Sequence, residues 1–135
     1  MQADQEIFHC CCRSQYSLYD YPNVGYRLCG YKIGKGTFIG MKCYLDDMCY
    51  DRIEIGRNVT ISYGVYFACH GRKQGHNRIV IRDGAYIGMR TSLVARTDIE
   101  IGENAVIGAC TLVNKSIPAG TTAMGVPCRI LEDKR

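Results

Sequence analysis

Residues 101–118 read IGENAV-IGACTL-VNKSIP, which is three consecutive six-residue units that each begin with an aliphatic residue. The same Ile-Gly opening recurs earlier in the chain, often in pairs that lie six residues apart. These dipeptides are Ile33-Gly34, Ile39-Gly40, Ile55-Gly56, Ile87-Gly88, Ile101-Gly102 and Ile107-Gly108. A period of six fits neither an α-helix nor the plain alternation of a strand. It is typical of a parallel β-helix, in which each unit forms one short strand and one corner of a triangular coil.

The first residue of each unit is aliphatic and the fifth is small or β-branched. Stacked coils would place both inside the prism, where their burial stabilises the array. Glycine in the second position is expected to permit a tight corner where a Cβ would clash. Repeats from Ile33 to Val126 predict about five coils. A sandwich of short strands is the alternative, but its turns would be about 8–12 residues apart.

The repeats divide the chain into three parts. Residues 1–28 do not repeat, and we expect them to form a short cap over the apolar end of the first coil. Residues 29–131 form the predicted solenoid domain, and residues 132–135 form a charged tail. Residues 68–80 break the six-residue phase and predict a protruding loop, the kind of segment that commonly carries function. Pro118 and Pro127 are expected to end the strand pattern.

Composition limits the classes of function. At 135 residues the chain has room for one domain, and it lacks the run of about 18–20 apolar residues that a membrane span requires. The net charge of +4 is too small to indicate nucleic-acid binding, although it suits an acidic small molecule. Asp4 and Glu6 precede any apolar segment, which is unlike a secretory signal.

The chain has nine cysteines, without the spacing of a disulfide framework or a zinc site. An odd number of scattered thiols favours a reducing cytoplasm and predicts no bound metal. Cys43 and Cys49 are six residues apart, and we expect both to fill the small inward position of successive units as hydrophobic residues.

The repeats and a C-terminal motif resemble the hexapeptide-repeat acyltransferases, the left-handed β-helix family. The motif comprises Ile107-Gly108-Ala109, residues 113–118 and Gly125-Val126-Pro127-Cys128-Arg129. The pattern is most similar to that of the maltose, galactoside and polysaccharide O-acetyltransferases, over about residues 26–131. This resemblance implies a left-handed prism, a homotrimer with active sites between neighbouring subunits, acetyl-CoA as the acyl donor and no required metal.

The resemblance also implies roles for His70 and Asp46, and the position of His76 in the protruding loop makes it a further candidate. His70 matches the family's general base, and an imidazole can take the proton of an acceptor hydroxyl as it attacks the thioester. A backbone N–H of the adjacent subunit would stabilise the oxyanion, and no acyl-cysteine is needed. Asp46 matches an asparagine that orients the acceptor in galactoside enzymes, and His76 is a candidate for the acceptor pocket. For both, an ordinary surface residue without function is the alternative.

Four positions match the coenzyme A contacts of the family, namely Met89, Ala109, Asn114 and Arg129, and the neighbouring Lys115 is a further candidate. At Met89 and Ala109 the family uses backbone groups to hold the pantetheine arm. Arg129 would face the phosphates, with help from Lys115. A second arginine of the galactoside enzymes is replaced here by Glu132.

Together these matches imply an acetyl-CoA-dependent O-acetyltransferase that acts on a sugar or glycan hydroxyl. An N-acetyltransferase acting on an amino-sugar or a xenobiotic stays open as an alternative. So does a γ-type carbonic anhydrase, which would need three histidines on zinc and could draw only on His9, His70 and His76. A non-catalytic scaffold is the third alternative.

Overall fold

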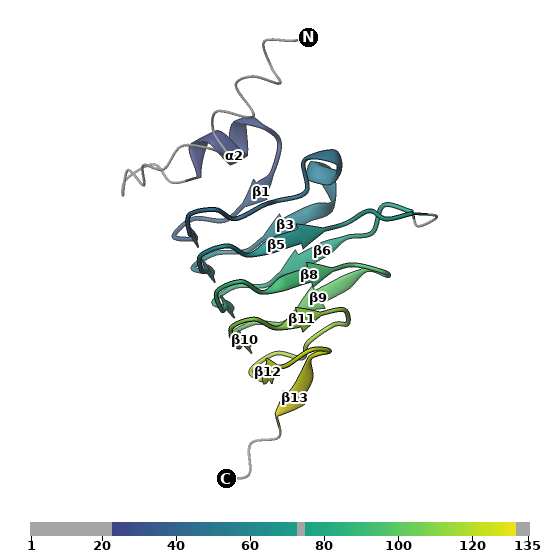
Figure 1. The fold of residues 1–135 in the computed structure, drawn as a ribbon. Coiled ribbons are helices and arrows are strands. Elements are labelled where there is room, and N and C mark those ends of the chain that lie inside the picture. The colour runs from purple at the N-terminus through teal and green to yellow at the C-terminus, as the bar shows by residue number, and fades with distance from the viewer. Residues whose placement is uncertain (1–22, 73–74, 132–135) are drawn as a thin grey trace.

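The computed structural model describes residues 23–72 and 75–131, which form a stack of triangular coils from β1 at one end to β13 at the other (Figure 1). The architecture is the predicted all-β, left-handed parallel β-helix. Of the predicted cap, the structure describes only residues 23–28, and they include the short helix α2 (Val24–Leu28). The predicted tail, residues 132–135, lies outside the described residues. No helix in the described part of the chain is long and apolar enough to cross a membrane.

Three sheets form the three faces of the prism. Sheet A has the order β1 (Lys32–Ile33), β3 (Ile53–Ile55), β6 (Ile79–Ile81), β9 (Ile99–Ile101). Sheet B has the order β13 (Arg129–Leu131), β12 (Thr122–Met124), β10 (Val106–Ile107), β7 (Tyr86–Ile87), β4 (Thr60–Ile61), β2 (Phe38–Ile39). Sheet C has the order β11 (Leu112–Val113), β8 (Ser92–Val94), β5 (Tyr66–Ala68).

The end of the solenoid differs from the expectation. Sheet A has four strands, and a bridge between Ile101 and Ile117 followed by β12 begins a further turn, so the array is slightly shorter than five full coils. The prediction that Pro118 and Pro127 end the strand pattern was wrong, because a strand follows each of them. Both prolines lie in connections, and β13 turns back to pair antiparallel with β12. A reversal of direction leaves no mark in a six-residue period.

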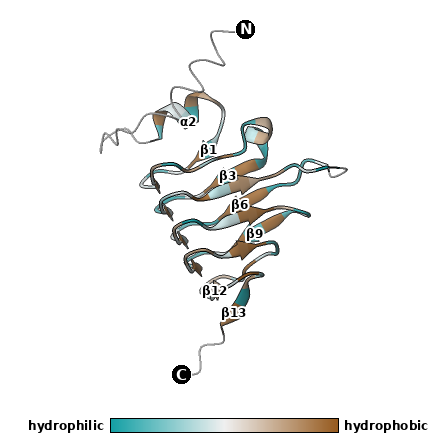
Figure 2. Cartoon of the chain, in the orientation of Figure 1, coloured by the Kyte–Doolittle hydropathy of each residue, from teal (hydrophilic) through white to brown (hydrophobic). Residues whose placement is uncertain are grey.

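The first and fifth residues of the units fill the prism, as predicted. Ile107 and Ala105 are fully buried, and Cys43 is also buried in a fifth position. The fifth-position Thr37 is buried too, and its hydroxyl donates to the carbonyl of Gly56 at 2.6 Å. A small polar residue is tolerated there because its hydroxyl has an acceptor on the next coil. The strands are the largely hydrophobic parts of each coil in Figure 2, and the loop after β5 is largely hydrophilic.

Glycine in the second position is required by the close approach of neighbouring coils. A Cβ on Gly102 would lie 2.3 Å from the backbone nitrogen of Ala119 in the next coil. The positive φ falls instead on the fourth residue of the unit, such as Gly36 (74°) and Asn58 (52°). The predicted clash is therefore confirmed, but the left-handed corner lies two residues further on. The fourth residue of three later units, Gly84, Asn104 and Gly120, also has a positive φ.

Cys49 does not occupy the position predicted for it. It is fully buried, but it lies in η1 (Asp47–Arg52), a 3-10 segment that leaves the solenoid between the first two coils. Its φ of −132° and ψ of 36° break the helical run. The six-residue count from Cys43 fails because η1 inserts extra residues before β3.

Replacing Gly102 by alanine is expected to reduce the free energy of unfolding by about 3 kcal/mol, because the new methyl group would force two coils apart. Gly75→Ala is the matched control, since nothing lies within 4 Å of a Cβ built there; it should change stability by less than about 0.5 kcal/mol. Urea unfolding measures both variants. Equal effects would contradict the close approach at the second position.

Candidate active site

His70 lies two residues after β5, where the chain leaves the solenoid for the predicted loop (Figure 1). The N–H of Asn77 donates to the carbonyl of Cys69 at 2.9 Å and closes the base of the loop. The Asn77 side chain also donates to the carbonyl of Ala95 on the following coil, at 2.9 Å. These bonds fix the backbone on both sides of the loop. The side chain of His70 remains 37% exposed.

Asp46 reaches His70 from the preceding coil. The bridge between Tyr44 and Tyr66 holds the two segments side by side. Oδ2 of Asp46 lies 2.5 Å from Nδ1 of His70 and also accepts the N–H of Cys69 at 2.8 Å. Oδ1 accepts the N–H of Met48 at 3.2 Å, as the N-cap of η1. The Asp46 carboxylate is fully buried, with its oxygens turned toward protein groups.

This arrangement decides which nitrogen of the His70 ring carries the proton. A carboxylate has no hydrogen to donate, so the short contact with Asp46 requires an N–H at Nδ1. Nε2 of the neutral ring then keeps its lone pair and can accept a proton. A general base whose ring is oriented by a second group is the arrangement that proton-abstracting catalysts use.

Cys49 lies next to this pair. Its Sγ, a carboxylate oxygen of Asp46 and a ring nitrogen of His70 all lie within 4.8 Å of one another. No other group of three or more potential metal ligands occurs among the residues that the structure describes. This group contains one histidine, and His76 is not part of it. The described residues therefore do not assemble the three-histidine site of a γ-type carbonic anhydrase; His9 lies outside them.

The buried thiols at the site are poor nucleophiles. Burial, with the nearby charge of Asp46, raises the pKa of the Cys69 thiol to about 12. Burial and the same carboxylate also raise the pKa of Cys49. Because the thiolate is the reactive form of cysteine, both side chains are unreactive near neutral pH.

Four of the five residues predicted to contact coenzyme A flank sheet C. Met89 and Ala109 occupy equivalent corners on successive coils, before β8 and β11, and the N–H of Cys110 donates to the carbonyl of Met89 at 2.8 Å. Asn114 and Lys115 follow β11, at the same corner of the prism that carries His70 two coils earlier.

Two predicted residues lie apart from these. Arg129 begins β13, exposed and opposite Met124 of β12, one coil beyond Ala109. His76 is exposed on the loop and, within the described part of the chain, forms no hydrogen bond with His70 or Asp46. The structure therefore brings together Asp46 and His70, and leaves His76 separate.

Two features of the site were not predicted: the contact between Asp46 and His70, and a pair of stacked tyrosines. The rings of Tyr44 and Tyr66 are 4.9 Å apart and 19° from parallel, and both are partly exposed. The Tyr44 hydroxyl donates to Oδ1 of Asp47 at 2.9 Å, and partial burial with this bond raises the pKa of Tyr44. The stack had a signal, because both tyrosines are the sixth residue of their units.

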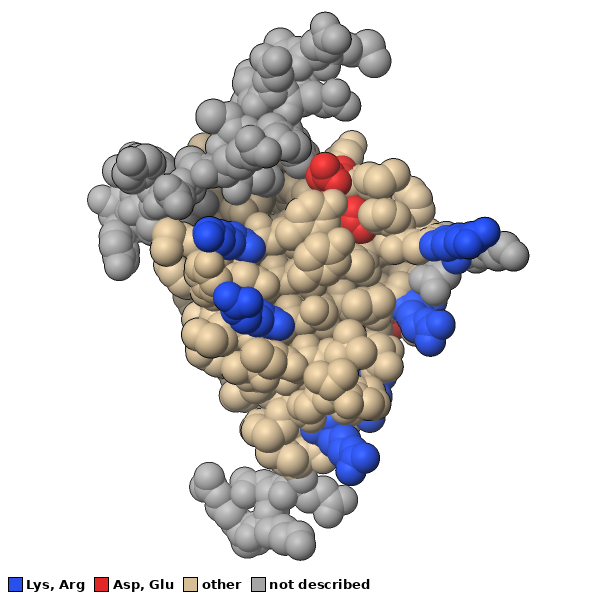
Figure 3. Space-filling model, viewed as in Figure 1, with Lys and Arg blue, Asp and Glu red and all other residues tan. Residues whose placement is uncertain are grey.

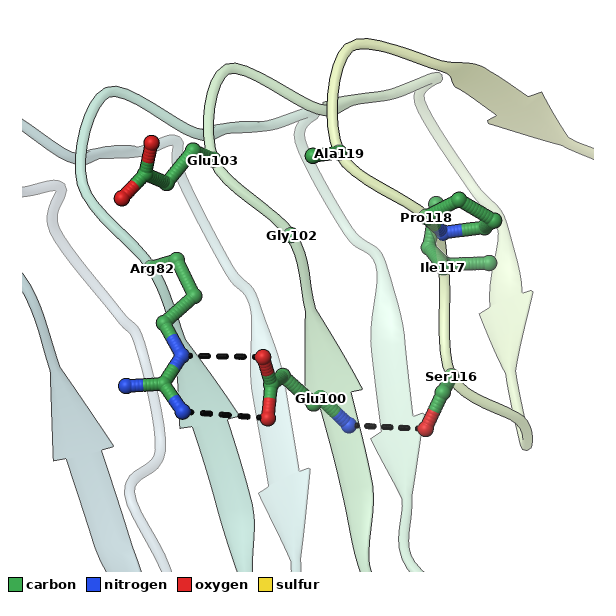
Figure 4. A pocket seen from close by; sticks show the side chains of 8 residues that line it. All are labelled: Arg82, Glu100, Gly102, Glu103, Ser116, Ile117, Pro118 and Ala119. Carbon is green, nitrogen blue, oxygen red and sulfur yellow. Dashed lines mark hydrogen bonds and ion pairs between the residues drawn. The ribbon is translucent and has the colours of Figure 1, made fainter.

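A hollow lies on sheet A, and Figure 4 shows Arg82 and Glu100 side by side among the residues that line it. Arg82 makes two hydrogen bonds to Glu100, at 2.9 and 3.1 Å, and the N–H of Glu100 donates to Oγ of Ser116 at 3.0 Å. The bonds to Arg82 lower the pKa of Glu100. No histidine or cysteine lines this hollow. Arg82 and Glu100 pair with each other, and we assign no chemistry to the hollow.

Comparison with known proteins gives several likenesses. No protein-family model matches the chain. The bifunctional protein GlmU of Rubrobacter xylanophilus is 36% identical over 110 residues, which cover 77% of this chain and 23% of that protein. A serine acetyltransferase of Bacillus licheniformis is 34% identical over 104 residues, which cover 76% of this chain and 45% of that protein.

Among solved structures, a hexapeptide-repeat-containing acetyltransferase of Vibrio cholerae, complexed with acetyl-CoA, superimposes with a TM-score of 0.78. It covers 99% of this chain and 86% of the other at 21% identity, a likeness of fold. In its repeats, its sequence and its fold, the chain is similar to the hexapeptide-repeat acetyltransferases. The chain spans less than half the length of the two sequence relatives described here.

Replacing Asp46 by alanine is expected to reduce the free energy of unfolding by about 2 kcal/mol, because the buried N–H of Cys69 would lose its acceptor. Asp47→Ala is the matched control, since that carboxylate receives only the exposed Tyr44 hydroxyl among the described residues; a change within about 0.5 kcal/mol is expected. Urea denaturation of both variants is the measurement. A loss at Asp46 no larger than that at Asp47 would contradict the buried bonding of the carboxylate.

Proposed function

We propose that the chain is an acetyl-CoA-dependent acetyltransferase in which His70 takes the proton from an acceptor hydroxyl. The observation that carries the proposal is the 2.5 Å contact between Nδ1 of His70 and the buried carboxylate of Asp46. That contact fixes the ring and leaves Nε2 as the proton acceptor. Asp46 then acts through His70, as a positioning residue, because its buried oxygens are already bonded to protein groups.

The chemistry needs no covalent enzyme intermediate. Nε2 accepts the hydroxyl proton as the oxygen forms its bond to the thioester carbonyl carbon. When the tetrahedral intermediate collapses, the carbon–sulfur bond breaks, and the imidazolium returns the proton to the departing thiolate. Asp46 stabilises the positive ring between these steps. Cys49 and Cys69 are buried protonated thiols, which supports a direct transfer.

Acetyl-CoA, the acyl donor, is proposed to lie over sheet C. Met89 and Ala109 would hold the pantetheine arm at one corner, and Lys115 and Arg129 would meet the phosphates, with Asn114 between. On the face shown in Figure 3, basic side chains gather along both edges and the surface between them is largely uncharged. Such a surface fits a ligand that joins an uncharged arm to a phosphorylated nucleotide.

The acceptor is proposed to be a hydroxyl of a sugar or glycan. The stacked, partly exposed rings of Tyr44 and Tyr66 support this, because Tyr66 and His70 both project outward from one extended segment and aromatic faces suit sugar rings. His76 on the loop would contact the acceptor. A small hydroxyl acceptor such as serine is the second candidate, because the matched relatives include serine acetyltransferases.

The working form is proposed to be a homotrimer. Outward residues of sheet B include Phe38, Tyr86 and Val106, which are 40–45% exposed. Sheet A carries ion pairs instead, such as that between Lys32 and Glu54. Burial of the apolar side chains against a second copy would remove them from water and leave the charged face outside.

Three variants separate the proposed roles. His70→Ala should lower kcat by about 10²–10⁴-fold, and added imidazole should restore part of it. Asp46→Asn should lower kcat by more than about tenfold, because the ring loses its fixed tautomer, with the KM for acetyl-CoA little changed. His76→Ala should raise the KM for the acceptor and leave kcat within about threefold.

These effects are measured as release of free coenzyme A from acetyl-CoA, with sugars, amino-sugars and serine as acceptors. Turnover that is unaffected by His70→Ala would overturn the general-base role. A wild-type chain that neither binds acetyl-CoA nor turns it over would overturn the proposed function itself.

A further inference from the structure

We propose that Asp46, Cys49 and His70 form a reversible, inhibitory binding site for a thiophilic divalent cation, for which Zn²⁺ is the best-suited ion. The three donor atoms already lie within 4.8 Å of one another. A tetrahedral zinc about 2.0–2.3 Å from each ligand would hold such donors about 3.3–3.8 Å apart. Oδ2 of Asp46 and Nδ1 of His70 are 2.5 Å apart, closer than two ligands of one zinc, so they must separate by about 1 Å when the ion binds. Small side-chain rotations would open the site.

The backbone presents these donors without rearrangement. Asp46 caps η1, and the non-helical φ and ψ of Cys49 interrupt the helical run three residues later. A separation of two intervening residues is common for paired zinc ligands. The third ligand, His70, comes from the next coil, whose position is fixed by parallel pairing. Asp46 and Cys49 are fully buried, and His70 faces the solvent side.

The ligand set selects the cation. A thiolate and an imidazole favour Zn²⁺ over Mg²⁺ or Ca²⁺, which prefer oxygen ligands. A carboxylate, a thiolate and a neutral imidazole carry two negative charges, so they neutralise a divalent ion in the buried site. Binding releases the Cys49 thiol proton to solvent. Oδ2 of Asp46 keeps its bond from the N–H of Cys69 and exchanges the His70 contact for the metal.

The consequence for catalysis rests on the proposed function. Coordination through Nδ1, the atom that now faces Asp46, moves the ring proton of His70 to Nε2. The ring then has no free lone pair for a hydroxyl proton. The cation would therefore inhibit acetyl transfer reversibly, and the thiol of Cys49 would be the residue that makes the enzyme sensitive to it.

The direct test uses Co²⁺ as the probe in the full chain, in a background where Cys10, Cys11 and Cys12 are replaced by serine to remove competing thiols. We expect a near-ultraviolet thiolate-to-cobalt charge-transfer band that saturates at one Co²⁺ per chain and is displaced by Zn²⁺. Cys49→Ala and His70→Asn should each lose the band or weaken Co²⁺ binding more than tenfold.

Cys43→Ala is the matched control, because Cys43 is a buried thiol outside the cluster and alanine fills the same position of the unit at Ala85 and Ala105. It should keep the band. His70→Asn changes a partly exposed side chain, and its folding, like that of Cys49→Ala, is checked by the thermal midpoint. No charge-transfer band in the parent, or a band that survives both cluster substitutions, would overturn the site.

The second readout is acetyl transfer. Zn²⁺ should inhibit acetyl transfer by the parent protein, which is the chain with serine in place of Cys10, Cys11 and Cys12, and EDTA should restore the activity. Cys49→Ala in this parent should need at least tenfold more Zn²⁺ for the same inhibition. Equal sensitivity of Cys49→Ala and Cys43→Ala would overturn the inhibitory role. A parent that has no transferase activity would overturn the proposed function, while the cobalt spectrum would still decide the cation site.

Discussion

Parallel hydrogen bonding between successive coils is the constraint on which the rest of the structure depends. Each strand pairs with the strand one coil along, in a fixed register, as Tyr66 does with Ser92. The same pairing sets Tyr44 against Tyr66 at the first two coils. Residues two to four positions further along, in segments that are far apart in the sequence, are thereby brought into contact. The pair Asp46 and His70 is a product of that register.

Strand pairing between coils would not by itself bury the carboxylate of Asp46. The 3-10 segment η1 turns the chain over Asp46 and supplies the N–H of Met48, and the N–H of Cys69 completes its shell. A buried carboxylate with fixed donors keeps its place without reorganisation when the ring beside it gains a proton. The catalytic proposal therefore needs no movement of the backbone near His70.

The regular part of the fold could be predicted because its causes are local. An aliphatic first residue and a small fifth residue repeat along the chain, and each buries where the period places it, as Ile107 and Ala105 show. His70 was singled out because it matches the general base of the family that the chain resembles and because it lies where the repeats stop. Asp46 was singled out, but its contact with His70 was not, because the path of η1 is not encoded in the period. Cys49 was misplaced for the same reason.

The reversed strand β13 shows a second limit. Its pairing with β12 depends on where a turn brings the chain back, and the residues around Pro127 specify a turn without specifying its partner. The residues predicted to contact coenzyme A show the same limit. Met89 and Ala109 align because the repeats align, whereas the position of Arg129 depends on the reversal. The six-residue period of the sequence predicts how the coils stack, whereas the paths of the segments that interrupt the period are known only from the structure.

The central claim is that Asp46 holds the proton of His70 on Nδ1 and leaves Nε2 free. Long-range proton–nitrogen NMR of the imidazole rings tests it directly, with His9→Ala and His76→Ala used to assign the His70 signals. At a pH where the ring is neutral, the account predicts a protonated Nδ1 and an unprotonated Nε2, and a change in this pattern in Asp46→Asn. A ring protonated on Nε2, or a pattern that Asp46→Asn leaves unaltered, would contradict it.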